Sequence, residues 1–310
     1  MIEVAIMLEG QNGLTWPRWQ RLAKATEDLG FAGLYRSDHY TNASPPDIES
    51  LELWTSLTWL ASHTKRIEFG PMVTPLSFRD PTMTARMAAA VDDLSGGRLI
   101  LGLGAGWQER EHTNYGWDLL DVPGRFARFE EGIEIIMRLL RNDETSDFQG
   151  DYYSIKEGIL LPRPHRSGGP PILIGGNGPK LTLPLVARFA TEWNSIYLPL
   201  EKFQELNTQL ESLLDAQGRQ PEEVRRSMMT GCEFSVDKRE VKKKVKARTK
   251  GKLSPKELHE RGLMVGTADE IVEQLGELAE AGLQRVMLQW LDLDDVDGLE
   301  ALAKGVLPQL

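Results

Sequence analysis

Eight short apolar runs alternate with helix-like segments along almost the whole chain, and this alternation limits the possible folds more than any other feature. The strand-like runs cover residues 2–8, 32–37, 66–73, 98–103, 171–175, 193–197, 228–236 and 285–290. Helical patterns are found at 16–29, 50–62, 81–94, 125–141, 179–190, 200–217, 239–248, 268–281 and 294–306. Alternating strands and helices form parallel sheets, so eight such units in 310 residues predict an α/β fold, a (β/α)8 TIM barrel.

The main alternative is a doubly wound open sheet. We favour the barrel because candidate functional residues follow many of the strands, whereas an open sheet gathers them at one switch point. We expect a single domain over residues 1–310 with two insertions, near 143–168 and 238–262. The first insertion contains no clear helical pattern and includes a predicted hairpin around Gly150 and Asp151.

The second insertion contains a basic run at 238–256, with ten Lys or Arg residues and one acid, Glu240. The run therefore carries a charge of +9, while the rest of the chain sums to −19. Two interpretations remain open. The run is either a solvated helix face or a mobile lid or rim that attracts an anionic ligand.

Composition excludes several classes of function. A net charge of −10 argues against nucleic acid as the main partner. The single cysteine, Cys232, excludes a disulfide framework and suits the cytoplasm, and five scattered histidines without H-x-x-x-H spacing argue against a metal site. The chain begins without a basic signal-peptide region and has no run of 18 apolar residues, so we expect no membrane segment.

The segment 98–107, RLILGLGAGW, is an apolar strand that runs into Gly102, Gly104 and Gly106. Glycines at a strand end let a flat ligand or another backbone approach closely. The spacing differs from a dinucleotide-binding loop, in which the third glycine comes one place later, and we expect no helix directly after it. Trp107 is a candidate to line a pocket, and the polar residues from Glu109 to His112 follow it.

Three other strand ends carry candidate functional residues. Asp38 could accept a hydrogen bond from a ligand, and His39 could act as an acid or base near neutral pH, although a purely structural histidine is an open alternative. The turn Gly175–Gly178 precedes a helix expected to start near Pro179 and could bind phosphate, unless it is a simple tight turn. The stretch 70–75 contains two prolines, which predict irregular backbone.

Together these segments resemble the luciferase-like monooxygenase superfamily, and most of all its deazaflavin-dependent oxidoreductases, which use coenzyme F420. The resemblance is carried by LYRSDH, by RIEFGPMVTPLSFRDPTMTARMAAAVDDLSGGRLILGLGAGWQEREHTNYG and by PPILIGGNGPKLTLPLVARFATEWN. It implies a (β/α)8 barrel, usually a homodimer, with the flavin or deazaflavin ring at the C-terminal mouth. Enzymes that use flavin mononucleotide (FMN) share several of these motifs.

The resemblance also implies roles for individual residues. A non-proline cis peptide at Met72–Val73 would back the ring, with Asp38, Thr74, Ala105 and Gly106 against the cofactor. His39 would serve as the acid, and Gly175, Gly176, Asn177 and Gly178 would hold the phosphate. Related sugar-phosphate dehydrogenases keep a catalytic Glu where this chain has Trp107, which argues against that substrate, and the nearby Glu109 is not assigned the role.

We therefore predict an enzyme that transfers a hydride between F420 and an unidentified organic substrate, with Trp107 and Glu109 in the substrate pocket. One alternative is an FMN-dependent luciferase-like monooxygenase. Another is a barrel that binds a flavin or deazaflavin without turnover.

Overall fold

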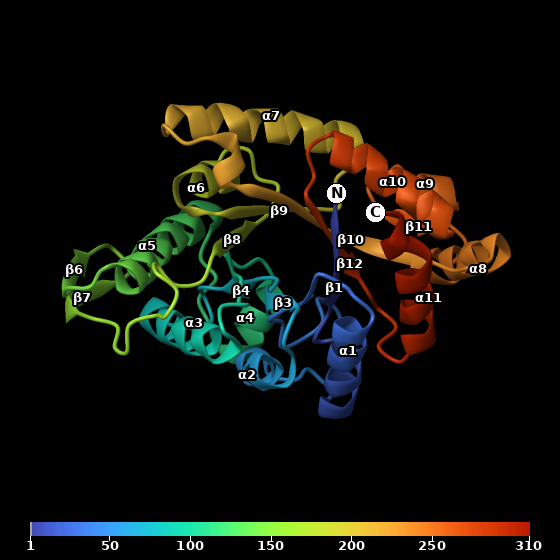
Figure 1. Ribbon diagram of the computed structural model, residues 1–310. Coiled ribbons are helices and arrows are strands. Elements are labelled where there is room, and N and C mark those ends of the chain that lie inside the picture. The colour runs from blue at the N-terminus through green and yellow to red at the C-terminus, as the bar shows by residue number, and fades with distance from the viewer. Residues whose placement is uncertain (1) are drawn as a thin grey trace.

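A computed structural model describes residues 2–310, and its main sheet is a parallel barrel surrounded by helices (Figure 1). The strand order is β3-β2-β1-β12-β10-β9-β8-β5-β4, with β11 added beside β10. The ring closes where Phe69 of β3 pairs with Leu99, just before β5. The barrel strands are β1 (Glu3–Leu8), β2 (Gly33–Arg36), β3 (Glu68–Pro71), β4 (Thr74–Pro75), β5 (Leu101–Gly104), β8 (Ile172–Gly175), β9 (Glu192–Ile196), β10 (Arg225–Phe234), β11 (Met264–Gly266) and β12 (Arg285–Gln289).

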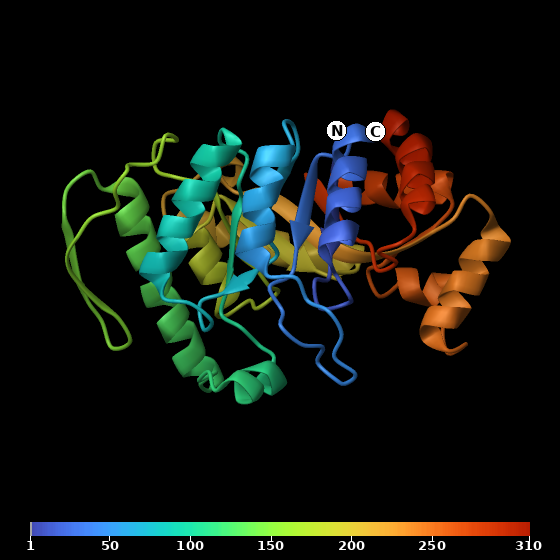
Figure 2. The same ribbon diagram turned by 90° about the horizontal axis from the view of Figure 1, so that it is seen from below.

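Helices lie outside the strands in both views (Figures 1 and 2). They are α1 (Trp16–Asp28), α2 (Leu53–His63), α3 (Pro81–Ser95), α4 (Glu109–Tyr115), α5 (Val122–Arg141), α6 (Thr182–Phe189), α7 (Leu200–Ala216), α8 (Lys238–Thr249), α9 (Pro255–His259), α10 (Ala268–Glu280) and α11 (Val296–Val306). The predicted TIM barrel is confirmed, and each of the eight predicted strands overlaps a barrel strand.

Two details of the prediction were wrong. A short helix, α4, begins at Glu109, only two residues after Trp107, although none was expected directly after the glycines. Its seven residues are too few to show helical periodicity, which explains the miss. Similarly, the helix expected near Pro179 begins later, at Thr182.

The alternation of side chains along the strands builds two apolar layers. In β1, Ala5 and Met7 face a small cluster inside the barrel, whereas Val4, Ile6 and Leu8 join the large core beneath the helices. Successive side chains of a strand point to opposite faces, so a strand buried on both faces must be apolar throughout.

A charged cluster fills the N-terminal end of the barrel. The Arg285 guanidinium donates to Tyr35 Oη at 2.6 Å and to Glu3 Oε2 at 2.8 Å, and it also pairs with Glu68. Its Nη1 lies 3.7 Å from the buried Glu192 carboxylate. Since these charges sit at the end opposite the strand carboxyl ends, we assign them to stability rather than to ligand binding.

The two predicted insertions lie on opposite sides of the barrel (Figures 1 and 2). One is the predicted hairpin, now seen as antiparallel β6 (Ser146–Gln149) and β7 (Ser154–Gly158). The basic run forms α8 and the turn that follows it. Three ion pairs join α8 to the rest of the chain: Lys238 to Glu270 at 2.7 Å, Lys244 to Asp295 at 3.3 Å and Arg248 to Glu233 at 2.6 Å.

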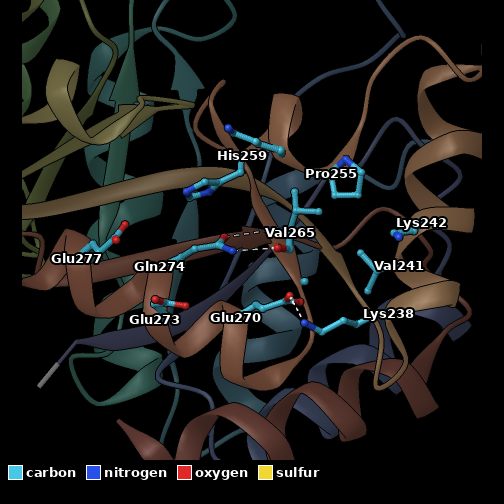
Figure 3. A pocket seen from close by; sticks show the side chains of 12 residues that line it. Lys238, Val241, Lys242, Pro255, His259, Val265, Glu270, Glu273, Gln274 and Glu277 are labelled. Atoms are coloured by element: carbon cyan, nitrogen blue, oxygen red, sulfur yellow. Dashed lines mark hydrogen bonds and ion pairs between the residues drawn. The ribbon is translucent and has the colours of Figure 1, made fainter.

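A groove of about 370 Å³ separates α8 and α9 from α10. Figure 3 shows the Lys238–Glu270 pair crossing it and Gln274 bonded to the Val265 backbone. The groove lies beside β11, away from the strand ends that carry the predicted site residues. In the described part of the chain, residues 2–310, no helix is long and apolar enough to cross a membrane.

Candidate functional site

The carboxyl ends of the third, fourth and fifth barrel positions form a close-packed surface around Val73. The Met72–Val73 peptide is cis, as predicted, and it separates β3 from β4. A Cβ added to Gly104 would lie 2.5 Å from Val73 Cγ2, and one added to Gly175 would lie 3.2 Å from Cγ1. These glycines therefore make room for Val73, and no side chain rises from the two strand ends beside it.

Gly106 turns the chain out of β5 towards α4. Its φ of +85° is a left-handed conformation, and an added Cβ would lie 2.9 Å from Ser77 Oγ. Both the backbone conformation and the space favour glycine here. Ala105, before it, is partly buried against the large core. Both residues are only partly buried, and neither carries a side chain larger than a methyl group.

Asp38 is buried and already has protein partners. Its carboxylate accepts from Thr74 Oγ1 at 2.6 Å and from both terminal nitrogens of Arg79, one of them at 3.2 Å. Arg79 also donates to Glu52 at 3.2 Å. We predicted that Asp38 and Thr74 contact a cofactor. In the structure they meet each other, and together with Arg79 they hold the segment that carries His39.

His39 forms a pair with a buried carboxylate from α4. Its Nδ1 lies 2.8 Å from Glu111 Oε1, and the other oxygen of Glu111 accepts from the Tyr40 backbone N–H at 3.1 Å. The Glu111 side chain is 1% exposed and that of His39 is 17% exposed. Because a carboxylate accepts hydrogen bonds, we assign the Nδ1 hydrogen to this contact, which leaves Nε2 for proton exchange with a ligand.

Two opposing effects act on His39. Burial lowers the pKa of the imidazole, but the hydrogen bond to Glu111 and the charge of that carboxylate outweigh burial, so the pKa is raised above its ordinary value. Glu9 and Asp38 contribute in the same direction. His39 therefore stays protonated to higher pH than a free imidazole, which suits a proton donor.

Trp107 stands beside this pair at the mouth. Its indole and the His39 ring meet edge to face, with centroids 5.5 Å apart and planes at 85°. The indole is 61% exposed. Glu109, the other predicted pocket residue, lies exposed at the start of α4, and no hydrogen bond or ion pair joins its carboxylate to any of residues 2–310.

The predicted phosphate turn follows β8 and leads to α6. The Asn177 side chain is used structurally: Nδ2 donates to the Ile196 carbonyl at 2.7 Å, and Oδ1 accepts from the Ile196 N–H at 2.9 Å. Gly176 and Gly178 pack against Thr182, the first residue of α6. The first two N–H groups of α6, those of Thr182 and Leu183, both donate to the Gly178 carbonyl at 3.0 Å. The third residue of the helix, Pro184, has no N–H, so an anion here would contact the turn rather than the helix start.

Several residues of the mouth were not predicted from the sequence. Arg79 holds Asp38, and a polar chain crosses the other side of the mouth, where Tyr197 Oη donates to Gln289 at 2.5 Å and Gln289 donates to Glu9 at 2.6 Å. Glu111 was noted only as one of four polar residues after Trp107. Its burial beside Gln108 and His112 is the pattern of one helix face, but that signal is usable only once α4 is known.

Residues 2–249 match the family model described as luciferase-like monooxygenase. The F420-dependent glucose-6-phosphate dehydrogenase of Amycolatopsis mediterranei is 32% identical over 172 residues, which are 54% of this chain and 48% of that protein. The 4-hydroxyprotoasukamycin monooxygenase of Streptomyces nodosus subsp. asukaensis is 33% identical over 162 residues, 52% of this chain and 42% of that protein. The matches thus span about half the length of these relatives.

A solved structure has the same fold over nearly its whole length. An F420-dependent secondary alcohol dehydrogenase, solved with an F420-acetone adduct, superimposes with a TM-score of 0.85 and covers 99% of this chain and 98% of its own. The sequence identity is 17%, so this likeness concerns the fold alone.

Proposed function

Because the chain belongs to the luciferase-like monooxygenase family, we propose that it is an oxidoreductase that uses coenzyme F420 to transfer a hydride to or from an organic substrate. The observation that carries this proposal is the His39–Glu111 pair, which stands at the barrel mouth on the strand-end side where Gly106 leaves β5. Relatives named as F420-dependent enzymes support the choice of cofactor. We also propose a homodimer in the cytoplasm that acts on a small molecule.

The residues present fit a flat ring that carries a phosphate. Gly104 and Gly175 carry no side chain, so the Val73 side chain packs over them and forms the surface at these strand ends. Gly106 turns the chain away from the strand end, and its carbonyl is held by Arg125. The turn Gly175–Gly178 contains three glycines without side chains, which would let a phosphate approach its backbone. In this arrangement Met72, Val73, Thr74, Ala105 and Gly106 would back the ring, and Gly175–Gly178 would position the phosphate.

The chemistry that a bound deazaflavin would supply is transfer of a hydride to or from its ring. The protein must handle the proton that accompanies the hydride. His39 Nε2 is placed to give that proton to the substrate during reduction or to take it during oxidation, while Glu111 holds Nδ1. Asp38, tied to Thr74 and Arg79, keeps the segment that carries His39 in position.

A second candidate function keeps the barrel and replaces the cofactor by FMN, with oxygen as co-substrate. The observation that favours it is the match to a monooxygenase at an identity similar to that of the F420-dependent relative. A barrel that binds the cofactor without turnover is the third candidate. It is favoured by Trp107, which stands where related sugar-phosphate dehydrogenases keep a catalytic Glu.

Side-by-side fluorescence titrations of the purified protein with F420 and FMN test the cofactor. We expect F420 to bind at least ~10-fold more tightly than FMN, a difference of about 1.4 kcal/mol. The same preference should persist in a His63→Ala variant, whose exposed imidazole stacks on Trp59. Tight binding of FMN with no response to F420 would overturn the proposal in favour of the monooxygenase.

A Glu111→Gln substitution tests the proton role separately from cofactor binding. The amide keeps the shape of the side chain and removes the charge that raises the pKa of His39, while burial continues to lower it. The His39 pKa should therefore fall, so the alkaline limb of a proton-donating reaction moves to lower pH. We would follow the His39 ring by NMR titration, with Glu109→Gln as the matched control. An unchanged His39 titration in Glu111→Gln would exclude the proposed coupling.

A further inference from the structure

The exposed indole of Trp107 points to the substrate class of the proposed enzyme. We propose that Trp107 stacks a planar, uncharged, conjugated ring, and that this contact places the reacting bond of the substrate next to His39. The inference rests on the proposed function, because it assumes that the mouth at His39 is where hydride transfer takes place. It concerns the substrate, which the residues proposed to hold the cofactor do not identify.

Trp107 is exposed on a backbone that is held on both sides. Before it, the Gly106 carbonyl accepts from Arg125 Nη1 at 3.0 Å. After it, the buried Gln108 side chain donates to the Thr41 carbonyl at 3.0 Å. A ligand that covers this indole therefore gains a large apolar contact and needs little additional ordering of the chain.

The position of the indole links it to the proton donor. Trp107 and His39 meet edge to face with their centroids 5.5 Å apart. A ring that packs on the indole consequently lies next to the imidazole. An exposed tryptophan in contact with a candidate acid is the arrangement expected where the substrate, rather than the protein core, completes the packing.

The cations around this part of the mouth already have acceptors. Arg79 pairs with Asp38, Arg110 with Asp47 at 2.5 Å, and Arg125 donates to main-chain carbonyls. An anionic substrate would have to compete with the Asp38 and Asp47 carboxylates for Arg79 and Arg110, whereas Arg125 has only carbonyl acceptors and a buried Nε without a partner in the described chain. Glu109, two residues after Trp107, adds an exposed carboxylate that disfavours an anion.

A cationic substrate is disfavoured by hydrogen bonding. Since Nδ1 of His39 is held by Glu111, the protonated ring offers an N–H donor at Nε2, and an ammonium group has no lone pair to accept it. The exposed Glu109 carboxylate disfavours an anion, so an uncharged ring with an acceptor oxygen is the ligand that the site accepts best. A conjugated ketone meets this description.

The reaction balances with the groups named. In the reducing direction, a bound reduced deazaflavin would supply the hydride that forms a C–H bond at the carbonyl carbon, and the C=O π electrons would move to oxygen. A proton from His39 Nε2 completes the hydroxyl group. The ketone is thus reduced to a secondary alcohol, the deazaflavin is oxidised, and solvent returns the proton to His39.

Calorimetric titration with four matched probes tests the inference. The probes are 2-acetylnaphthalene, which is planar and uncharged, 2-naphthoate, which is anionic, 2-naphthylmethylammonium, which is cationic, and cyclohexyl methyl ketone, which lacks the aromatic ring. We expect the uncharged naphthyl ketone to bind at least ~10-fold more tightly than the other three. Trp107→Ala should remove about 10-fold of this affinity, and Trp107→Phe should retain most of it.

The control variant is Trp16→Ala, which removes an exposed indole that packs on Trp59 of α2. It should leave the binding of all four probes unchanged. Equal affinity for the four probes, tighter binding of either charged probe, or an unchanged Kd in Trp107→Ala would overturn the inference. F420 titration of the same samples separates the two proposals. If F420 binds but the four probes bind equally well, only the proposed substrate class is rejected. If the naphthyl ketone is preferred but F420 does not bind, the proposed cofactor is rejected.

Discussion

Replacing His39 with Ala is expected to lower the turnover number by about 10²–10⁴, the usual contribution of a positioned general acid or base. The imidazole faces the mouth with Nε2 available, and Glu111, 2.8 Å from Nδ1, orients the ring and raises its pKa. We would measure reoxidation of reduced F420 by uncharged aromatic ketones under steady-state conditions.

Two further variants test whether the loss comes from proton transfer. His39→Gln can still donate a hydrogen bond to Glu111 but cannot transfer a proton, so its loss in rate should match that of His39→Ala. His63→Ala, at an exposed histidine of α2, should behave as the wild type. The affinity for F420 should change little in all three, because His39 is proposed to act on the proton. A His39→Gln enzyme within threefold of the wild-type rate would contradict this role.

Replacing Arg285 with Met is expected to lower the free energy of unfolding by about 3–5 kcal/mol, the range for breaking a buried ion pair from one side. The Arg285 side chain is 1% exposed and joins Glu3 and Glu68, with Glu192 at 3.7 Å. Without the guanidinium, the buried Glu192 carboxylate would lose its main counter-charge. Urea unfolding followed by far-UV circular dichroism measures the loss.

A double-variant cycle identifies the cause. Adding Glu192→Gln to Arg285→Met should recover part of the lost stability, because it removes the carboxylate that was left uncompensated. Arg225→Met is the matched control: this arginine is 34% exposed and lies 3.8 Å from Glu192, so its loss should cost less than ~1 kcal/mol. If Arg285→Met proved as mild as Arg225→Met, the cluster would not be a stabilising feature of the barrel.

The barrel could be predicted because its signals are local. Apolar runs such as 285–290 act within one element, and each predicted strand overlaps a barrel strand. The cis peptide at Met72–Val73 was also predicted, but from family resemblance rather than from periodicity. Helix α4 was missed because seven residues carry too little periodicity to separate a helix from a loop.

The site was predicted less completely than the fold. Asp38 and Asn177 stay predicted cofactor contacts, and the structure adds protein partners that were not predicted: Thr74 and Arg79 for Asp38, and the Ile196 backbone for Asn177. Such partners come from other strands and loops, and a single sequence does not specify their pairing. The strands that carry these positions were predicted correctly, and their carboxyl ends lie together because parallel strands must end on the same side of a barrel.

The sequence by itself determined the alternation of strands and helices, and with it that His39, Gly106 and Gly175 follow strands whose carboxyl ends meet at one end of the sheet, because these signals act within single elements and parallel strands share one direction. Only the tertiary structure decided which acid pairs with His39. Glu109 and Glu111 are two positions apart, and the partner lies 72 residues from His39 in the chain. The turn of α4 buries Glu111 against the imidazole and leaves Glu109 exposed, because residues two apart on a helix point in different directions.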